Sequence, residues 1–197
     1  LLCLITMLCW GSWGNSQKLA AKTWRYELFY WDYVIGILLI SLLFGFTLGS
    51  NGDLGRGFVA DISQVSTRNF WSAFVGGVIF NGSNILLSAS ISLAGMSVAF
   101  PVGVGIALVL GVFINYFGAP QGAPVILFAG VLLVVLAIIV NGAASGKMSS
   151  GTEEQKTKKK GVIIAIAAGI LMSFFYRFVA ATMDLDNLEY PASGMLT

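Results

Sequence analysis

The sequence contains no histidine and only two cysteines, Cys3 and Cys9. These two lie six residues apart in one predicted helix, about 9 Å along its axis, so they cannot form a disulfide without breaking that helix. A metal site built from histidine and cysteine is excluded by these counts. No serine or cysteine has a base nearby and no predicted span holds paired acids, so we expect no catalytic residues, no metal, no cofactor and no enzyme.

Charged residues are also scarce. They make up 10% of the 197 residues, whereas a soluble domain carries about 25%. Hydrophobic residues reach 57%, and the mean hydropathy is +0.85. These values exclude a water-soluble core. The formal net charge is only +2, and no basic stripe with interleaved aromatic residues appears, so nucleic acid is not an expected partner.

The apolar residues fall in runs of about 20, the length that crosses a hydrocarbon layer of about 30 Å. Two longer polar connections separate them. The connection at 50–69 could form a short interfacial helix around Phe58–Ile62. The connection at 146–160 is a lysine-rich linker that cannot bury a core. The sequence therefore predicts an all-α polytopic membrane protein with spans over 1–21, 28–49, 70–93, 96–117, 124–145 and 161–182.

Lysine and arginine are distributed unevenly between the two sides of the predicted membrane. Cytoplasmic loops retain these residues during insertion, so the richer side is the cytoplasmic one. Only Arg56 and Arg68 lie on the poorer side, and Arg177 lies within the last span. The richer side holds Lys18, Lys22, Arg25, Lys147, Lys156, Lys158, Lys159 and Lys160. We therefore expect the 146–160 linker to be cytoplasmic. Because the sequence begins at a leucine inside an apolar run, without an initiator methionine, we also expect it to be part of a longer protein.

Polar side chains inside a bilayer are costly, so each needs a partner helix, a water-filled cavity or a ligand. In the third span, Asn81, Asn84 and Ser88 occupy positions i, i+3 and i+7 and share one helix face. This face either binds a polar solute through its amide groups or hydrogen-bonds to a neighbouring helix, and both interpretations stay open.

Small residues recur every four positions in two other spans. Such stripes let helix backbones approach closely, and we interpret both as helix contacts. Pro101 removes a backbone donor and should kink its helix. The stripes are Ala99, Gly103, Ala107 and Gly111 in the fourth span, and Gly161, Ala165, Gly169 and Ser173 in the sixth.

Further candidate binding residues lie within the first, fourth and sixth spans. Trp10 and Trp13 either anchor the first span at the membrane boundary or stack on a planar solute. Arg177 either meets a carboxylate or carbonyl partner or extends to the outer interface. Asn115 continues the small-residue stripe of the fourth span in register. The substrate-binding candidates are Trp10, Trp13, Asn15, Asn81, Asn84, Ser88, Asn115, Tyr176 and Arg177.

Five segments occur together in the order and spacing of one known family. They are Trp10–Lys18, Asp32–Tyr33, Thr47–Gly49, Gly95–Ala99 and Asn115–Phe117. Through nearly its whole length the chain resembles the ureide permease family of the drug/metabolite transporter superfamily, near the glucose/ribose and rhamnose porters.

The resemblance implies a ten-helix secondary transporter made of two inverted five-helix repeats, with the solute site between them. Residues 1–145 would form the first repeat, 146–160 the cytoplasmic linker, and 161–197 the first helix of the second repeat and the loop after it. Plant members move allantoin, uracil and related planar amides, with protons. The expected partners are then a small solute, a proton or other coupling ion and the lipid bilayer, with a homodimer also considered.

Two features depart from the plant pattern. The linker is short, and Arg177 stands where the resemblance implies a proline or a small residue. These departures suggest a bacterial member in the plasma (inner) membrane and leave the substrate open. A sugar porter is the alternative within transport, with the tryptophan faces stacking on a pyranose. A non-transporting membrane scaffold is the alternative from another class.

Overall fold

A computed structural model describes residues 2–51, 55–118, 120, 122–147, 152–184, 187 and 191–196. Within these residues the chain is helical and contains no strand, apart from an isolated bridge between Met183 and Leu196. The helices are α1 (Leu2–Ala20), α2 (Tyr26–Phe46), α3 (Phe58–Gln64), α4 (Thr67–Ala94), α5 (Met96–Gly118), α6 (Pro124–Lys147) and α7 (Thr152–Ala180). The predicted all-α class is therefore confirmed.

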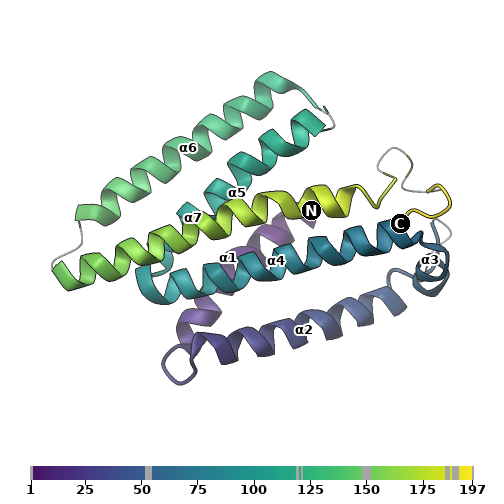
Figure 1. Ribbon diagram of the computed structural model, residues 1–197. Coiled ribbons are helices and arrows are strands. Elements are labelled where there is room, and N and C mark those ends of the chain that lie inside the picture. Colours follow the sequence, from purple (N-terminus) through teal and green to yellow (C-terminus); the bar gives the residue numbers. More distant parts are fainter. Residues whose placement is uncertain are drawn as a thin grey trace.

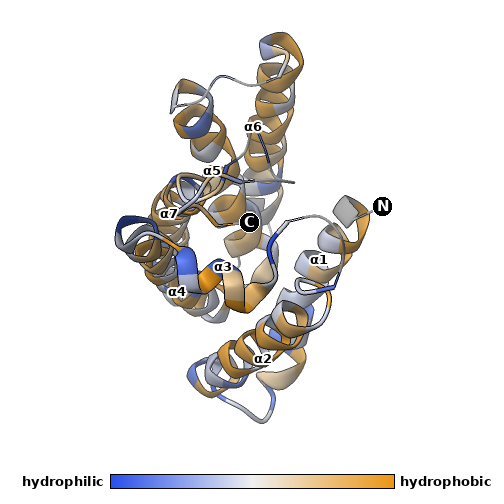
Figure 2. Cartoon of the chain, turned by 90° about the vertical axis from the view of Figure 1, so that its right-hand side faces the viewer, coloured by the Kyte–Doolittle hydropathy of each residue, from blue (hydrophilic) through white to orange (hydrophobic). Residues whose placement is uncertain are grey.

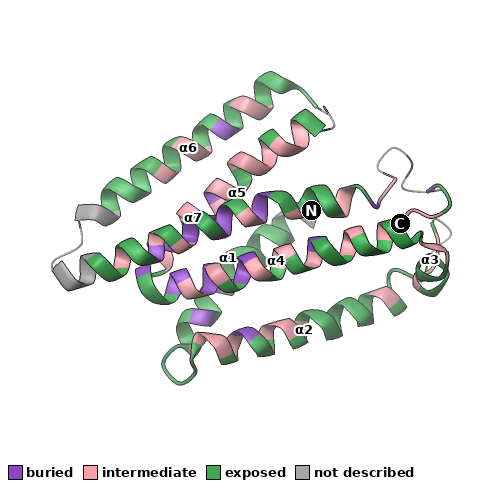
Figure 3. Cartoon of the chain, in the orientation of Figure 1, coloured by how far each residue is buried: buried purple, intermediate pink, exposed green. Residues whose placement is uncertain are grey.

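In the described part of the chain, five helices are long and apolar enough to cross a membrane: α2, α4, α5, α6 up to Ala144, and α7 from Lys156. The outward faces of α2 and α6 are almost entirely apolar and exposed (Figures 2 and 3). A face of that kind is stable only against lipid or another apolar surface. The chain is thus a multi-pass membrane protein.

Two predicted spans differ from the structure. The span predicted over 1–21 forms α1, but α1 is not among the five apolar helices, because Ser12, Asn15, Ser16 and Gln17 lower its hydropathy. The last helix begins at Thr152 instead of 161, because Glu, Gln and Lys are good helix formers and extend it beyond its apolar part. The second half of the predicted linker is therefore helical, while 148–151 lie outside the described residues.

The centre of the bundle is the antiparallel pair α4 and α7, which lie side by side (Figure 1). Near one end the Ser72 hydroxyl donates to the Phe178 carbonyl at 2.9 Å. Near the other end the Ser90 hydroxyl donates to the Gly161 carbonyl at 2.7 Å. Buried residues concentrate on these two helices and on the facing side of α5 (Figure 3).

Both small-residue stripes are helix contacts, as predicted, and the structure shows that they pack α5 against α7. A Cβ added at Gly169 would lie 2.5 Å from the Gly103 carbonyl oxygen. One added at Gly103 would lie 3.3 Å from the Ala165 carbonyl oxygen. The backbones of the two helices therefore touch directly, and α6 packs against α5.

The lysine-rich ends gather at one end of the bundle. Gly161, at the start of the apolar part of α7, packs against Ala94 at the end of α4. Gln17, next to Lys18 in α1, donates to the Ser88 carbonyl on the last two turns of α4. Arg56 and Arg177 lie at the opposite end, where α3 is found (Figure 1).

The short helix predicted in the 50–69 connection is present as α3, and it holds the segment that follows α7. Arg56 donates to the carbonyls of Pro191 at 2.8 Å and Met195 at 2.7 Å, and it pairs with Asp61 at 3.1 Å. Gln64 accepts from the Gly194 amide at 2.6 Å. We call this set of contacts the Arg56 clasp. It fixes the chain just beyond α7 to the start of α4.

Candidate functional site

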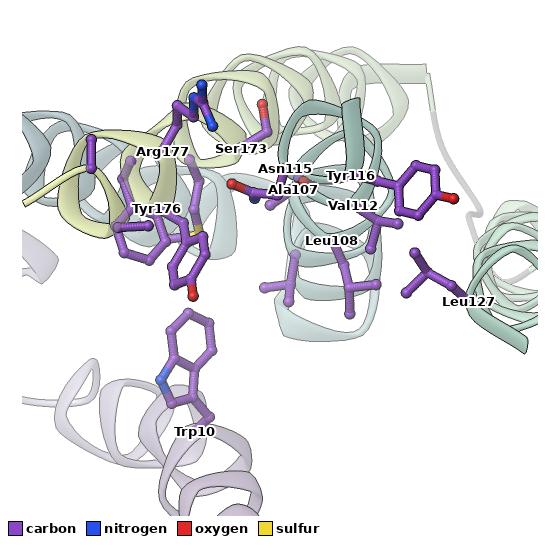
Figure 4. A pocket seen from close by; sticks show the side chains of 16 residues that line it. Trp10, Ala107, Leu108, Val112, Asn115, Tyr116, Leu127, Ser173, Tyr176 and Arg177 are labelled. Atoms are coloured by element: carbon purple, nitrogen blue, oxygen red, sulfur yellow. Dashed lines mark hydrogen bonds between the residues drawn. The ribbon is translucent and has the colours of Figure 1, made fainter. Parts of the chain in front are cut away.

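Polar residues of the predicted set gather in two places. The first is a cavity of about 650 Å³ between α1, α5, α6 and α7. Trp10 enters it from α1 and Tyr176 from α7, while Asn115 projects from α5 (Figure 4). Most of the remaining lining is aliphatic or aromatic. An apolar cavity with a few polar groups suits a small solute with both an apolar and a polar surface.

Arg177 brings a positive charge to this cavity. Its guanidinium lies against Gly118, the last residue of α5, where an added Cβ would collide with it. The Asn115 side-chain Nδ2 donates to the Gly111 carbonyl at 2.7 Å. Because this bond uses the nitrogen, the side-chain Oδ1 can accept a hydrogen bond from a solute. Four of the nine candidates, Trp10, Asn115, Tyr176 and Arg177, therefore share one cavity.

The second place is the contact between α1 and α4. Asn84 is 3% exposed and Ser88 is fully buried, and the Ser88 carbonyl meets Gln17 of α1. Asn84 precedes Ser88 by one helical turn and so shares its face of α4. The Asn84 Nδ2, Ser88 Oγ and Trp13 Nε1 atoms are buried and have no hydrogen-bond partner among the residues that the structure describes. A buried polar group without a partner costs about 1–3 kcal/mol. This arrangement is therefore expensive unless another molecule satisfies it during function.

Gln17 belongs to the same contact, although it was not among the predicted binding residues. It is 3% exposed, and its Nε2 donates to the Ser88 carbonyl at 3.0 Å, while its Oε1 is buried without a partner. The signal in the sequence was its spacing, because residues 13 and 17 share a helix face. We call Trp13, Gln17, Asn84 and Ser88 the polar seam.

The two other candidates lie apart from the cavity and the seam. Asn81 is exposed and turned toward α2, where it accepts from the Tyr30 hydroxyl at 3.1 Å. It therefore links α4 to α2 and does not continue the wall formed by Asn84 and Ser88. Asn15 is exposed and bonds only within its own helix, to the Gly11 carbonyl at 3.4 Å.

A second cavity, of about 700 Å³, lies at the lysine-rich end between α1, α2, α4 and α5. Gln17, Trp24 and Ser97 line it together with Lys18, Arg25 and Glu27. Arg25 donates to Glu27 at 3.0 Å, and this hydrogen bond raises the pKa of Arg25 above its ordinary value. Gln17 thus stands between the polar seam and this cavity.

The fold and these sites define a class: a multi-pass helical membrane protein that keeps polar groups in cavities and seams between its spans. A family model for ureide permeases matches residues 29–169, which is more than half of the chain. The chain belongs to the ureide permease family.

Curated relatives agree with this assignment. Ureide permease 1 of Arabidopsis thaliana is 27% identical over 115 residues, which cover 58% of this chain and 30% of the relative. Ureide permease 3 of the same plant is 27% identical over 115 residues, covering 58% of this chain and 33% of the relative. The chain thus aligns with about a third of the length of these relatives. No solved structure matches it.

Proposed function

We propose that the whole protein is a secondary active transporter that moves a small ureide or nucleobase, such as allantoin or uracil, with protons. Family membership supports the transporter class. The observation that supports a ureide or nucleobase as the solute is the polar seam. Its amide, hydroxyl and indole groups are buried without hydrogen-bond partners among the described residues. These groups match the carbonyl and N–H groups on the edge of a planar cyclic amide.

In the proposed arrangement, residues 1–145 are a first repeat of five helices, 146–160 a cytoplasmic linker, and 161–197 the start of an inverted second repeat. Transport then depends on the partner repeat, since repeat transporters rock one half against the other around a central site. We place the protein in the plasma membrane of a bacterium, with its lysine-rich end inside. A homodimer is compatible with this proposal.

The test is uptake by the full-length protein in proteoliposomes with an inward proton gradient. Labelled uracil and allantoin should accumulate, and collapse of the gradient should abolish accumulation. Competition by rhamnose or glucose, without competition by either amide, would instead support a sugar porter. A protein that moves no solute and gains no thermal stability from any of them would support a scaffold.

The substitution that tests the seam is Asn84→Ala, which should abolish uptake while membrane insertion is unchanged. Asn141→Ala is the matched control. Asn141 is an exposed asparagine on α6 whose amide bonds only to the Ala137 carbonyl of its own helix, at 3.0 Å. Normal uptake of the correct solute by Asn84→Ala would remove Asn84 from the solute site.

A further inference from the structure

The two cavities approach each other along α1. Trp10 lines the 650 Å³ cavity, and Gln17 lines the 700 Å³ cavity at the opposite, lysine-rich end. These residues are seven positions apart, which is about two helical turns, or about 10 Å along the axis. Along α1, therefore, about the length of one small solute separates a residue of the first cavity from a residue of the second.

Trp13 stands between them, about one turn from each. Its ring lies 5.5 Å from that of Tyr33 on α2 and 6.1 Å from that of Phe100 on α5. Gly14 is buried against Met96, whose sulfur would lie 2.7 Å from an added Cβ. Trp13, Tyr33, Phe100 and Met96 thus form a layer of aromatic and thioether groups around this part of α1, and Met96 also lines the second cavity. We call this layer the Trp13 layer.

The polar seam crosses this layer. Trp10 packs on Phe80, with ring centroids 6.5 Å apart, and Gln17 bonds to Ser88. Residue numbers rise together along both helices, so α1 and α4 run parallel and Trp13 lies near the level of Asn84. In this conformation the unpartnered seam atoms are buried, and Gln17 is the seam residue that also lines the second cavity. The cost of leaving them unsatisfied favours any motion that lets a polar solute or water enter between α1 and α4.

We infer that the polar seam is the path of the solute between the two cavities, that the Trp13 layer is the barrier on it, and that Gln17 selects the solute. The Gln17 carboxamide is oriented by its bond to the Ser88 carbonyl, so its Oε1 is presented as an acceptor for an N–H group of the solute. This structure is the closed state of the path. The inference rests on the proposed function and adds to it a route, a barrier and a selecting residue.

The route is tested without any solute, by cysteine labelling of the full-length protein in proteoliposomes with its native cysteines replaced. Trp10→Cys should react with a membrane-impermeant maleimide added on one side, and Gln17→Cys with the reagent added on the other. Ser97→Cys, which lines the second cavity, marks the Gln17 side, and Leu132→Cys, on an outward face of α6, marks lipid exposure. Labelling of both α1 positions from the same side, or no labelling at Gln17→Cys, would overturn the route.

The selecting residue is tested by comparing uracil with its N-methylated derivatives, which lack one N–H each. The unmodified protein should prefer uracil in kcat/KM, and Gln17→Met should reduce that preference about tenfold, since it removes the acceptor with little change of volume. Gln17→Glu keeps an oxygen at this position and should retain part of the preference. If Gln17→Met slows all these solutes in proportion, Gln17 is only structural. If the unmodified protein moves none of them, the proposed function fails, while the labelling result still decides the route.

Discussion

The Arg56 clasp allows a quantitative prediction. Arg56→Ala removes two short hydrogen bonds, to the carbonyls of Pro191 and Met195, and the ion pair with Asp61. The side chains of Arg56 and Asp61 are 27% and 11% exposed, so solvent screens these contacts only partly. Hydrogen bonds to charged groups contribute about 1.5–3 kcal/mol each when well protected. Discounted for this exposure, the loss should be about 2–3 kcal/mol of local stability.

The loss should appear at the clasped segment first. The Gly194 amide donates to Gln64 at 2.6 Å and the Leu196 amide to the Thr182 carbonyl at 2.8 Å, so both report on its opening. A change of 2–3 kcal/mol corresponds to amide hydrogen exchange roughly 30- to 140-fold faster. Hydrogen exchange with mass spectrometry on the full-length protein in detergent would measure it.

Arg68→Ala is the matched control, since it removes the same charge a short distance along the chain, in the first turn of α4. Arg68 is exposed and makes no hydrogen bond within the part of the chain that the structure describes. Its substitution should leave exchange at the clasped segment unchanged. If Arg56→Ala and Arg68→Ala give the same exchange rates, the clasp does not hold the segment, and the energetic reasoning is wrong.

Three further outcomes follow from helix packing and charge. Gly169→Ala should destabilise the full-length protein by about 1–3 kcal/mol, because its Cβ would meet the Gly103 carbonyl. Gly142→Ala is the control, because a Cβ added at Gly142 meets no other atom within 4 Å. It should leave the denaturation midpoint of the protein, measured in mixed micelles, unchanged. Ser90→Ala should cost only about 0.6 kcal/mol by the same measurement, the usual value of an interhelical hydrogen bond in a membrane. Lys160→Cys should react with an impermeant maleimide only from the cytoplasmic side, and reaction from outside would reverse the predicted orientation.

Much of the fold was predictable from local patterns. The spans that form α2, α4, α5 and α6 were predicted within a few residues, because a run of about 20 apolar residues has few alternatives in a bilayer. The stripes of small residues were correctly interpreted as helix contacts, because such stripes mark close backbone approach, but the sequence did not say which helices they join. Where polar residues interrupt or extend an apolar run, as in α1 and at the start of α7, local patterns predict the nature and the bounds of the helix less well.

The candidate sites were predictable only in part. Asn81 and Asn84 are equally polar and lie one turn apart, yet Asn81 is exposed and meets Tyr30 of α2 while Asn84 is buried. Gln17 lies within the Trp10–Lys18 segment but was not among the predicted binding residues. Neither distinction is encoded in helical spacing, because spacing fixes which residues share a face and not which helix covers that face.

The sequence by itself determined that this chain crosses a membrane and on which side of the membrane its basic residues lie. It also determined which polar residues would cost free energy to bury in the bilayer. These properties depend on residue type and on distance along the chain. The tertiary structure alone decided that the polar seam is closed and unpartnered, that Arg177 turns over the end of α5 into a cavity, and that α3 holds the segment beyond α7. Those contacts join residues as many as 139 positions apart, and their geometry depends on how all the helices pack at once.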